Sequence, residues 1–397
     1  MAKRLRTLRD LDVRERRVLV RVDYNVPLED VRVVDDTRIR ETLQTIQWLI
    51  EQRARIILCS HLGRPKGQVR EELRLAPVAQ TLSGLLGRSI HYVRDIVGPE
   101  AQAMARRLEP GEVGLLENLR FDPREEANDP VFARALADLA ERYVNDAFGA
   151  AHRAHASVVG VAQLLPSAAG FLMEREVAAL ERVLHSAERP FVLVLGGAKV
   201  SDKIGVIENV LPRADALLLG GGMANTFLKA CGYELGRSLV EADKVDEARR
   251  LLALAEQRGV RVELPVDVVI APSLEQPAKR RVVQVGDIPA DCAVFDIGPE
   301  TVRRFGEVIA SAKLLVWNGP MGVYEVPEFR DGTRGVAEAV ARCAGFTLVG
   351  GGDSVAALQE LGMADRVSHL STGGGATLEY LEGRELPGVA VLMEEMP

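Results

Sequence analysis

The chain has 397 residues, which is longer than one hydrophobic core usually organises, so two domains are expected. Hydrophobic residues make up 47% and charged residues 27%, and the net charge of −7 argues against nonspecific binding to nucleic acid or to a membrane surface. No apolar run reaches the roughly 18 residues of a membrane helix, and the basic N-terminus lacks the apolar segment of a signal peptide. Four scattered cysteines without a C-x-x-C pair indicate a reducing cytoplasm and give no support for a disulfide framework or a zinc site.

In the first half of the chain, short apolar runs alternate with helical segments. Strands are predicted at 17–22, 55–59, 114–116 and 143–144, and helices at 37–52, 76–86 and 131–141. The apolar runs do not alternate with polar residues, which is typical of strands buried on both faces of a parallel sheet. The first half therefore indicates an α/β unit.

A connecting helix is expected between the halves, because Met173, Val177, Leu180 and Leu184 recur at helical spacing within 171–187. The second half repeats the α/β pattern. Its predicted strands are 191–195, 216–219, 260–264, 266–270, 314–317 and 346–349, each followed by a glycine-rich turn or a helix.

The segment 191–205 runs from a buried strand into Gly196 and Gly197, and Lys199 and Lys203 then open a predicted helix. Glycines let backbone approach a ligand closely, and a helix N-terminus attracts anions. The segment therefore favours a polyphosphate site, although it does not match the Walker A pattern. An ordinary strand–turn–helix with two surface lysines remains the alternative.

Basic side chains of the first half follow the ends of several predicted strands or open the next helix: Arg38, His61, Arg64, Arg120 and Arg153. Loops at the carboxyl ends of parallel strands gather at one edge of the sheet, and arginine suits phosphate and carboxylate oxygens. The pattern predicts a site for a small polyanion. His61 could be a general base or a neutral contact to the anion, and both readings stay open. His152 and His155 lack a third metal ligand at suitable spacing, so no metal site is predicted there.

Three glycine runs of the second half, at 220–222, 350–352 and 373–375, follow strands or open helices. Together with the glycines of 191–205 they indicate a nucleotide laid across one sheet edge. Asp353 or Ser354 is the expected N-cap of a helix, and Asp353 could instead bind Mg²⁺. G-x-G-x-x-G is absent after the first strand, which argues against a dinucleotide enzyme.

Seven motifs now stand in order: Arg21–Pro27, Ser60–Lys66, Leu116–Phe121, Gly149–Ser157, Gly196–Ile204, Trp317–Glu325 and Gly350–Ser354. The chain closely resembles the phosphoglycerate kinases of bacterial type, from the first strand to the final helix. The resemblance implies an α/β fold of two doubly wound, parallel-sheet (Rossmann-like) domains joined by a hinge helix. The implied boundaries are 1–170 for phosphoglycerate binding, 171–189 for the hinge and 190–379 for nucleotide binding, with 380–397 packed back on the first domain.

The resemblance also implies a reaction, 1,3-bisphosphoglycerate + ADP ⇌ 3-phosphoglycerate + ATP, with Mg²⁺, in a cytoplasmic monomer that binds neither nucleic acid nor membrane. The implied phosphoglycerate site is Asp23, Tyr24, Asn25, Arg38, His61, Leu62, Gly63, Arg64, Arg120 and Arg153. The implied nucleotide site is Gly197, Lys203, Asn318, Glu325, Gly351, Gly352, Asp353 and Ser354, with Asp353 near the metal. Arg38, Lys199 and Lys203 would be catalytic, without a general base and with closure of the domains.

Two departures from the family pattern bear on ligand binding. Asp122 and Pro123 stand where the family usually has histidine, and Val294 stands where it usually has a glycine beside the adenine pocket. The rival classes are a non-catalytic phosphometabolite-binding protein and, further off, an NAD-dependent dehydrogenase.

Overall fold

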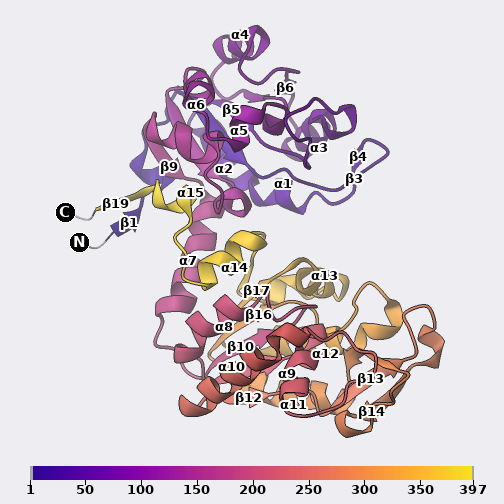
Figure 1. Cartoon of the computed structure of the whole chain (residues 1–397). Helices are drawn as coiled ribbons and strands as arrows, with labels where there is room; N and C mark the ends of the chain where they lie inside the picture. Colours follow the sequence, from indigo (N-terminus) through magenta and orange to yellow (C-terminus); the bar gives the residue numbers. More distant parts are fainter. Residues whose placement is uncertain (1–2, 396–397) are drawn as a thin grey trace. The chain divides into compact units, whose positions relative to one another are not determined.

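The computed structural model describes residues 3–395, and these form two compact units (Figure 1). Unit 1 contains the residues up to Ala178 together with those from Glu385 onward, and unit 2 contains Ala179–Arg384. The division falls within one helix, α7 (Phe171–His185).

Six parallel strands form the sheet of unit 1, in the spatial order β6-β7-β5-β2-β8-β9. Their bounds are β2 (Arg17–Val22), β5 (Arg55–Cys59), β6 (Ile90–Tyr92), β7 (Val113–Leu115), β8 (Arg142–Asp146) and β9 (Ser167–Ala169). The chain crosses from β2 to β5 on one side and later returns to β8 on the other. This reversal of strand order opens a crevice at the carboxyl end of β2.

The helices of unit 1 before α7 are α1 (Thr37–Glu41), α2 (Leu43–Glu51), α3 (Ala76–Leu86), α4 (Pro99–Arg107), α5 (Pro123–Glu126) and α6 (Pro130–Ala137). The single helix predicted over 37–52 is interrupted at Thr42. Its hydroxyl donates to the Ile39 carbonyl at 2.9 Å and lies 2.8 Å from the Tyr24 hydroxyl. A threonine that bonds a preceding carbonyl competes with the helical ladder, which accounts for the break.

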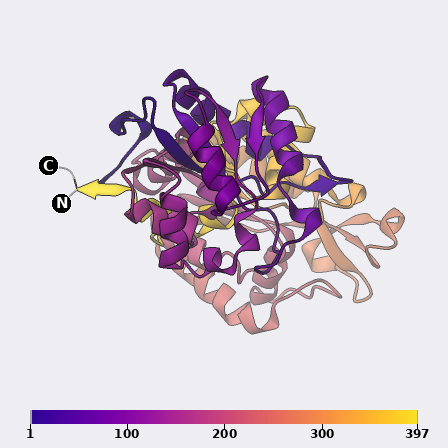
Figure 2. The same ribbon diagram turned by 90° about the horizontal axis from the view of Figure 1, so that it is seen from above.

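The two ends of the described chain lie side by side in unit 1 (Figure 2). Strand β1 (Lys3–Leu5) pairs antiparallel with β19 (Met393–Glu395), and α15 (Pro387–Ala390) precedes β19. The Gly388 amide donates to the Ala151 carbonyl at 2.8 Å. A short hairpin of β3 (Leu28–Glu29) and β4 (Arg32–Val33) completes the unit.

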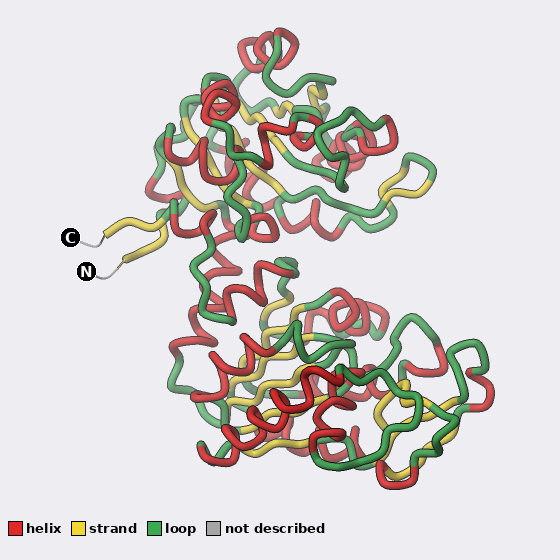
Figure 3. The backbone as a smooth tube through the Cα atoms, in the orientation of Figure 1, coloured by secondary structure: helices red, strands yellow, loops and turns green. Residues whose placement is uncertain are grey.

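Unit 2 has its own parallel six-stranded sheet, in the order β12-β11-β10-β16-β17-β18 (Figure 3). The strands are β10 (Phe191–Leu195), β11 (Ala216–Leu219), β12 (Arg261–Glu263), β16 (Leu314–Asn318), β17 (Phe346–Gly350) and β18 (His369–Leu370). The helices are α8 (Ile204–Val210), α9 (Gly221–Ala230), α10 (Val245–Gln257), α11 (Pro299–Ser311), α12 (Asp331–Arg342), α13 (Gly352–Glu360) and α14 (Gly375–Leu381). Trp317 and Phe305 are fully buried in its core.

A separate antiparallel sheet stands beside this one in unit 2, with β13 (Asp267–Ala271) between β14 (Arg281–Gln284) and β15 (Ala293–Ile297). The strand predicted at 266–270 therefore does not belong to the parallel sheet, and that expectation is wrong. The connection 272–280 is too short for the crossover of about a dozen residues that joins parallel strands, so the chain turns back on itself.

Candidate functional site

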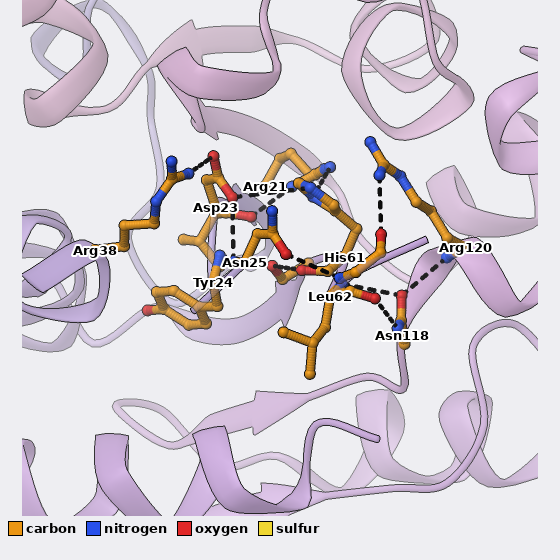
Figure 4. A network of polar contacts seen from close by, with 12 residues as sticks. Arg21, Asp23, Tyr24, Asn25, Arg38, His61, Leu62, Asn118 and Arg120 are labelled. Atoms are coloured by element: carbon orange, nitrogen blue, oxygen red, sulfur yellow. Dashed lines mark hydrogen bonds and ion pairs between the residues drawn. The ribbon is translucent and has the colours of Figure 1, made fainter. Parts of the chain in front are cut away.

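The carboxyl ends of β2 and β5 carry the polar cluster of unit 1 (Figure 4). Asp23 and Asn25 follow β2, and His61 and Gly63 follow β5. The Gly63 amide donates to Asn25 Oδ1 at 2.8 Å, and the Asn25 amide donates to Asp23 Oδ1 at 3.2 Å. The first bond fastens the two loops to each other, because both strands end at the same edge of the sheet, and the second bond orders the loop after β2.

Arg38, on α1, forms an ion pair with Asp23 (Figure 4). The Arg38 side chain is 34% exposed, whereas the Asp23 side chain is 10% exposed. Burial alone would raise the pKa of Asp23, but the positive charges of Arg38 and Arg21, with the hydrogen bond from the Asn25 amide, outweigh burial and hold that pKa below its ordinary value. A Cβ on Gly149 would lie 2.5 Å from Asp23 Oδ2, so the absence of a side chain at 149 leaves room for the pair.

His61 is buried between charged neighbours. Its Nδ1 lies 3.1 Å from Arg21 Nη2, and its Nε2 lies 4.0 Å from Asp23 Oδ1. Burial lowers the pKa of His61 well below its ordinary value, and the nearby arginines lower it further against the opposing effect of Asp23. The ring is therefore neutral at pH 7.

Arg120, in the 3-10 turn Leu119–Phe121, reaches the same loop and donates to the Gly63 carbonyl at 3.0 Å. Burial lowers its pKa, and the charges of Arg21 and Arg153 act in the same direction. The guanidinium remains a cation at pH 7, because arginine does not lose its proton in proteins. Arg153 is exposed beside this group and adds its charge to the cluster.

Three of the predicted phosphoglycerate residues do not contribute their side chains to this polar cluster. Tyr24 and Leu62 are buried in the core, where the Tyr24 amide donates to Ser60 Oγ at 2.8 Å. Arg64 is exposed, and within residues 3–395 it has no ion pair. Their predicted roles in binding stay predictions.

Asn118 was not singled out from the sequence, yet it organises this edge. Its Oδ1 accepts from the amides of Leu62 at 3.2 Å and of Arg120 at 3.1 Å, and its Nδ2 donates to the Leu62 carbonyl at 2.8 Å. It stands two residues before Arg120 in the motif Leu116–Phe121. Asn118 is fully buried, and a buried asparagine of this kind is hydrogen-bonded, but its burial is visible only in the structure and no sequence spacing marks it.

In unit 2, the loops after β10, β16 and β17 enclose a cavity of about 560 Å³ with the start of α14. Most of the predicted nucleotide residues line it, together with Lys199: Gly197, Lys203, Asn318, Gly351, Gly352 and Asp353. A cavity of this size matches the usual range for small-molecule sites.

Lys203 is buried at this cavity and donates to Asn318 Oδ1. Burial lowers its pKa to about 8, although Asp202 and Glu382 act in the opposite direction. Lys199 is exposed at the same cavity. The expectation that both lysines open a helix is wrong: α8 begins at Ile204, with Lys203 as its N-cap, and Lys199 lies before it.

Close backbone approach explains the glycines of this cavity. Gly319 has φ +97°, and a Cβ there would lie 2.4 Å from the Gly196 carbonyl oxygen. Gly351 has φ +90° and is the N-cap of α13, so the expected cap by Asp353 or Ser354 is wrong. Both stand in the first turn of α13, and Ser354 Oγ accepts from the Gly319 amide at 2.9 Å. Ser354 thus braces the loop and does not line the cavity.

A second cavity of unit 2, about 730 Å³, shares Gly197 and Asp353 with the first. Glu325 and Val294 line it, so the cavity stays open beside the valine. Burial and the charge of Glu325 raise the pKa of Asp353. Two neighbouring carboxylates suit Mg²⁺, which proteins bind through one or two carboxylates plus substrate phosphates. Among the described residues no three His, Cys, Asp or Glu gather to hold a metal by themselves.

A family model described as phosphoglycerate kinase matches residues 8–384. A phosphoglycerate kinase of Thermomicrobium roseum is 81% identical over 391 residues, covering 98% of this chain and 100% of that protein. The chain belongs to the phosphoglycerate kinase family. A phosphoglycerate kinase of Moorella thermoacetica is 59% identical over 389 residues, covering 98% of this chain and 99% of that protein.

Solved structures agree with the sequence relatives. The phosphoglycerate kinase of Coxiella burnetii superposes with a TM-score of 0.88 at 42% identity, covering 98% of this chain and 99% of that chain. The enzyme of Pyrococcus horikoshii gives a TM-score of 0.88 at 36% identity, covering 98% of each chain. The predicted family, α/β fold class and phosphotransferase class are confirmed, and the two rival classes are not favoured. In the described part of the chain, no helix combines the length and apolarity needed to cross a membrane.

Proposed function

We propose that this chain catalyses reversible phosphoryl transfer from 1,3-bisphosphoglycerate to MgADP, giving 3-phosphoglycerate and MgATP. The observation that carries the proposal is the Arg38–Asp23 pair within a cluster of cations, in a chain whose other unit holds a glycine-lined cavity with Lys203. Because cations that lie close together repel one another, a cluster of cations with few carboxylates favours the binding of an anion. The membership of the family supplies the identity of the two ligands.

In this proposal the basic edge of unit 1 binds phosphoglycerate through Arg38, His61, Arg120 and Arg153, with Asp23 and Asn25 orienting them. The cavities of unit 2 bind the nucleotide through Lys203, Asn318, Glu325 and the start of α13. Mg²⁺, held by the phosphates and Asp353, would neutralise phosphate charge. The enzyme would act in the cytoplasm as a monomer.

No general base is required in this mechanism. In the ATP-consuming direction the nucleophile is the carboxylate of 3-phosphoglycerate, and carboxyl groups of this type have pKa values of about 3.5–4 and are already ionised at pH 7. Loose phosphoryl transfer spreads negative charge over the equatorial oxygens of the moving group. Arg38 and Lys199 would stabilise that charge, and Lys203 would hold the nucleotide's phosphates. Alignment of the two substrates can supply roughly 7–11 kcal/mol of the barrier reduction.

Transfer also requires that the two ligands meet with water excluded, since water would compete as acceptor. We propose that the two units close when both ligands are bound, with α7 as the hinge. Small-angle scattering should show a smaller radius of gyration in the presence of 3-phosphoglycerate and MgATP together than with either alone. Unchanged dimensions with both ligands would remove closure from the mechanism.

A coupled assay with 3-phosphoglycerate and MgATP tests the reaction itself. Formation of ADP that depends on 3-phosphoglycerate is the expected result. Binding of 3-phosphoglycerate without turnover would instead indicate a phosphometabolite-binding protein. Turnover that requires a nicotinamide cofactor would indicate a dehydrogenase.

A further inference from the structure

Arg21 is a fully buried arginine on the central strand of unit 1, and the mechanism above gives it no task. Its Nε donates to Ser157 Oγ at 2.8 Å, and its Nη1 donates to the Val22 carbonyl. Ser157 is itself anchored, because its hydroxyl and amide donate to the two carboxylate oxygens of buried Glu125 at 2.5 and 2.9 Å. The guanidinium is therefore fixed in position before any ligand binds.

The remaining nitrogen of this guanidinium, Nη2, lies 3.1 Å from Nδ1 of His61 (Figure 4). A guanidinium has five N–H donors and no acceptor. In this hydrogen bond His61 Nδ1 must therefore accept, so it carries no proton. In a neutral imidazole the proton then sits on Nε2, the nitrogen on the side of Asp23.

We infer that Arg21 is a positioning residue that holds His61 as the neutral Nε2–H tautomer, so that His61 offers an anionic ligand a hydrogen-bond donor and cannot serve as a base. The identity of that ligand as phosphoglycerate rests on the proposed function, whereas the tautomer does not. This resolves the two readings of His61 left open by the sequence.

The charged groups that face His61 support this state. Asp23, which follows β2, favours the protonated ring, while Arg21 on β2, Arg38 on α1 and Arg120 in the 3-10 turn oppose it. Protonating Nδ1 would break the bond to Arg21 and set two cations against each other in a buried site. His61 should consequently stay neutral between about pH 5.5 and 8, a range that includes the pKa of about 6.5 of a free histidine.

Nitrogen NMR of the ligand-free, full-length protein tests the tautomer directly. The imidazoles of the six histidines are labelled with ¹⁵N, His61 is assigned by its loss in His61→Gln, and free histidine serves as the reference for titration. We expect an unprotonated Nδ1 and a protonated Nε2 throughout the pH range. A protonated Nδ1, or a titration that follows free histidine, would overturn the inference, and neither result depends on whether the protein is a kinase.

Kinetics of variants test the consequence for binding. In Arg21→Met, His61 can titrate, so the KM for 3-phosphoglycerate should rise about tenfold at pH 8 and approach the wild-type value near pH 5.5, where a protonated ring attracts the anion. The phosphate of the substrate also titrates in this pH range, but it affects both enzymes equally, so its effect cancels in the ratio of the variant KM to the wild-type KM. We expect kcat to change less than about threefold, since the loss is in ground-state binding.

Arg21→Lys is the matched control, because it retains a cationic donor and should keep the KM ratio pH-independent. Ser157→Ala loosens the anchor of Arg21 without touching His61 and should give an intermediate KM. A KM ratio for Arg21→Met that does not change with pH would overturn the assignment. If Arg21→Met does not fold, the wild-type NMR and Ser157→Ala still decide it.

Discussion

Replacement of Lys203 by methionine should make the ligand-free protein more stable and nucleotide binding weaker. Burial lowers the pKa of Lys203 from 10.5 to about 8, and its partner Asn318 carries no charge to compensate it. At about 1.4 kcal/mol per pKa unit, keeping this ammonium buried costs about 3 kcal/mol at pH 7. Loss of the bond to Asn318 costs about 1–3 kcal/mol. Lys203→Met should therefore gain about 0–2 kcal/mol of unfolding free energy.

The pH dependence of that gain has a definite sign. Above pH 10.5 the lysine is neutral in both the folded and the unfolded chain, and its charge imposes no cost. Between pH 10.5 and 8 the unfolded chain binds the proton first, so the stability of the wild type falls as the pH falls. Below pH 8 the cost is fully present. The stability advantage of Lys203→Met should thus grow by about 3 kcal/mol between pH 10.5 and 7.

The same residue predicts proton uptake on nucleotide binding. Phosphates that contact Lys203 stabilise its charged form and bring its pKa back up, so about half a proton should be taken up per MgADP at pH 8. Titration calorimetry in two buffers of different ionisation enthalpy measures this number, and urea unfolding at pH 7 and 10 measures the stability change. Lys203→Met should abolish the uptake.

The exposed Lys199 provides the matched control for stability. Lys199→Met should change the free energy of unfolding by less than about 0.5 kcal/mol at either pH. Equal pH profiles of stability for the wild type and Lys203→Met, together with no proton uptake at pH 8, would refute the reasoning that burial governs Lys203.

Three further substitutions separate the parts of the site. Arg38→Ala should lower kcat by about 10³-fold or more because it removes a cation from the transferring phosphoryl group, while the nucleotide Kd from calorimetry stays within about threefold; a near-normal kcat would contradict that role. Gly319→Ala should cost about 1–3 kcal/mol in thermal unfolding from its φ of +97° alone, with more from the contact with Gly196, and an unchanged Tm would contradict the required glycine. Val294→Gly should weaken MgADP binding about fivefold through the loss of about 1 kcal/mol of apolar contact, whereas tighter binding would show that Val294 narrows the cavity.

The fold class followed from the sequence because continuous apolar runs identify strands buried on both faces. Phe191–Leu195 and Leu314–Trp317 are such runs, and every residue of both is buried. The strand at Asp267–Ala271 has a similar composition but pairs antiparallel. An apolar run records burial and carries no information about the direction of its neighbours, so only the length of the connection could have distinguished the two cases.

The sequence predicted which residue types of the candidate site follow the strands. It predicted less well which of these residues contact one another. Arg38 and His61 were singled out because cations after strands gather at one edge, and both do. Arg21 lies within a strand, and Asn118 lies in a loop where its side chain bonds to backbone groups. At neither position does a polar side chain have a distinctive spacing in the sequence. The roles of Arg64 and of the other predicted ligand residues in binding stay predictions.

The two sites differ in how each holds its cation before a ligand arrives. Arg38 is paired with the carboxylate of Asp23, so its charge is balanced within unit 1. Lys203 is paired with a neutral amide, and Asp202 and Glu382 offset only part of the cost of burying its charge, so its pKa stays lowered. With His61 held neutral as well, no group identified at the phosphoglycerate site should change charge near pH 8. In that pH range, binding of the nucleotide should therefore depend on pH, because Lys203 changes its charge, whereas binding of phosphoglycerate should not depend on the charge of the protein groups.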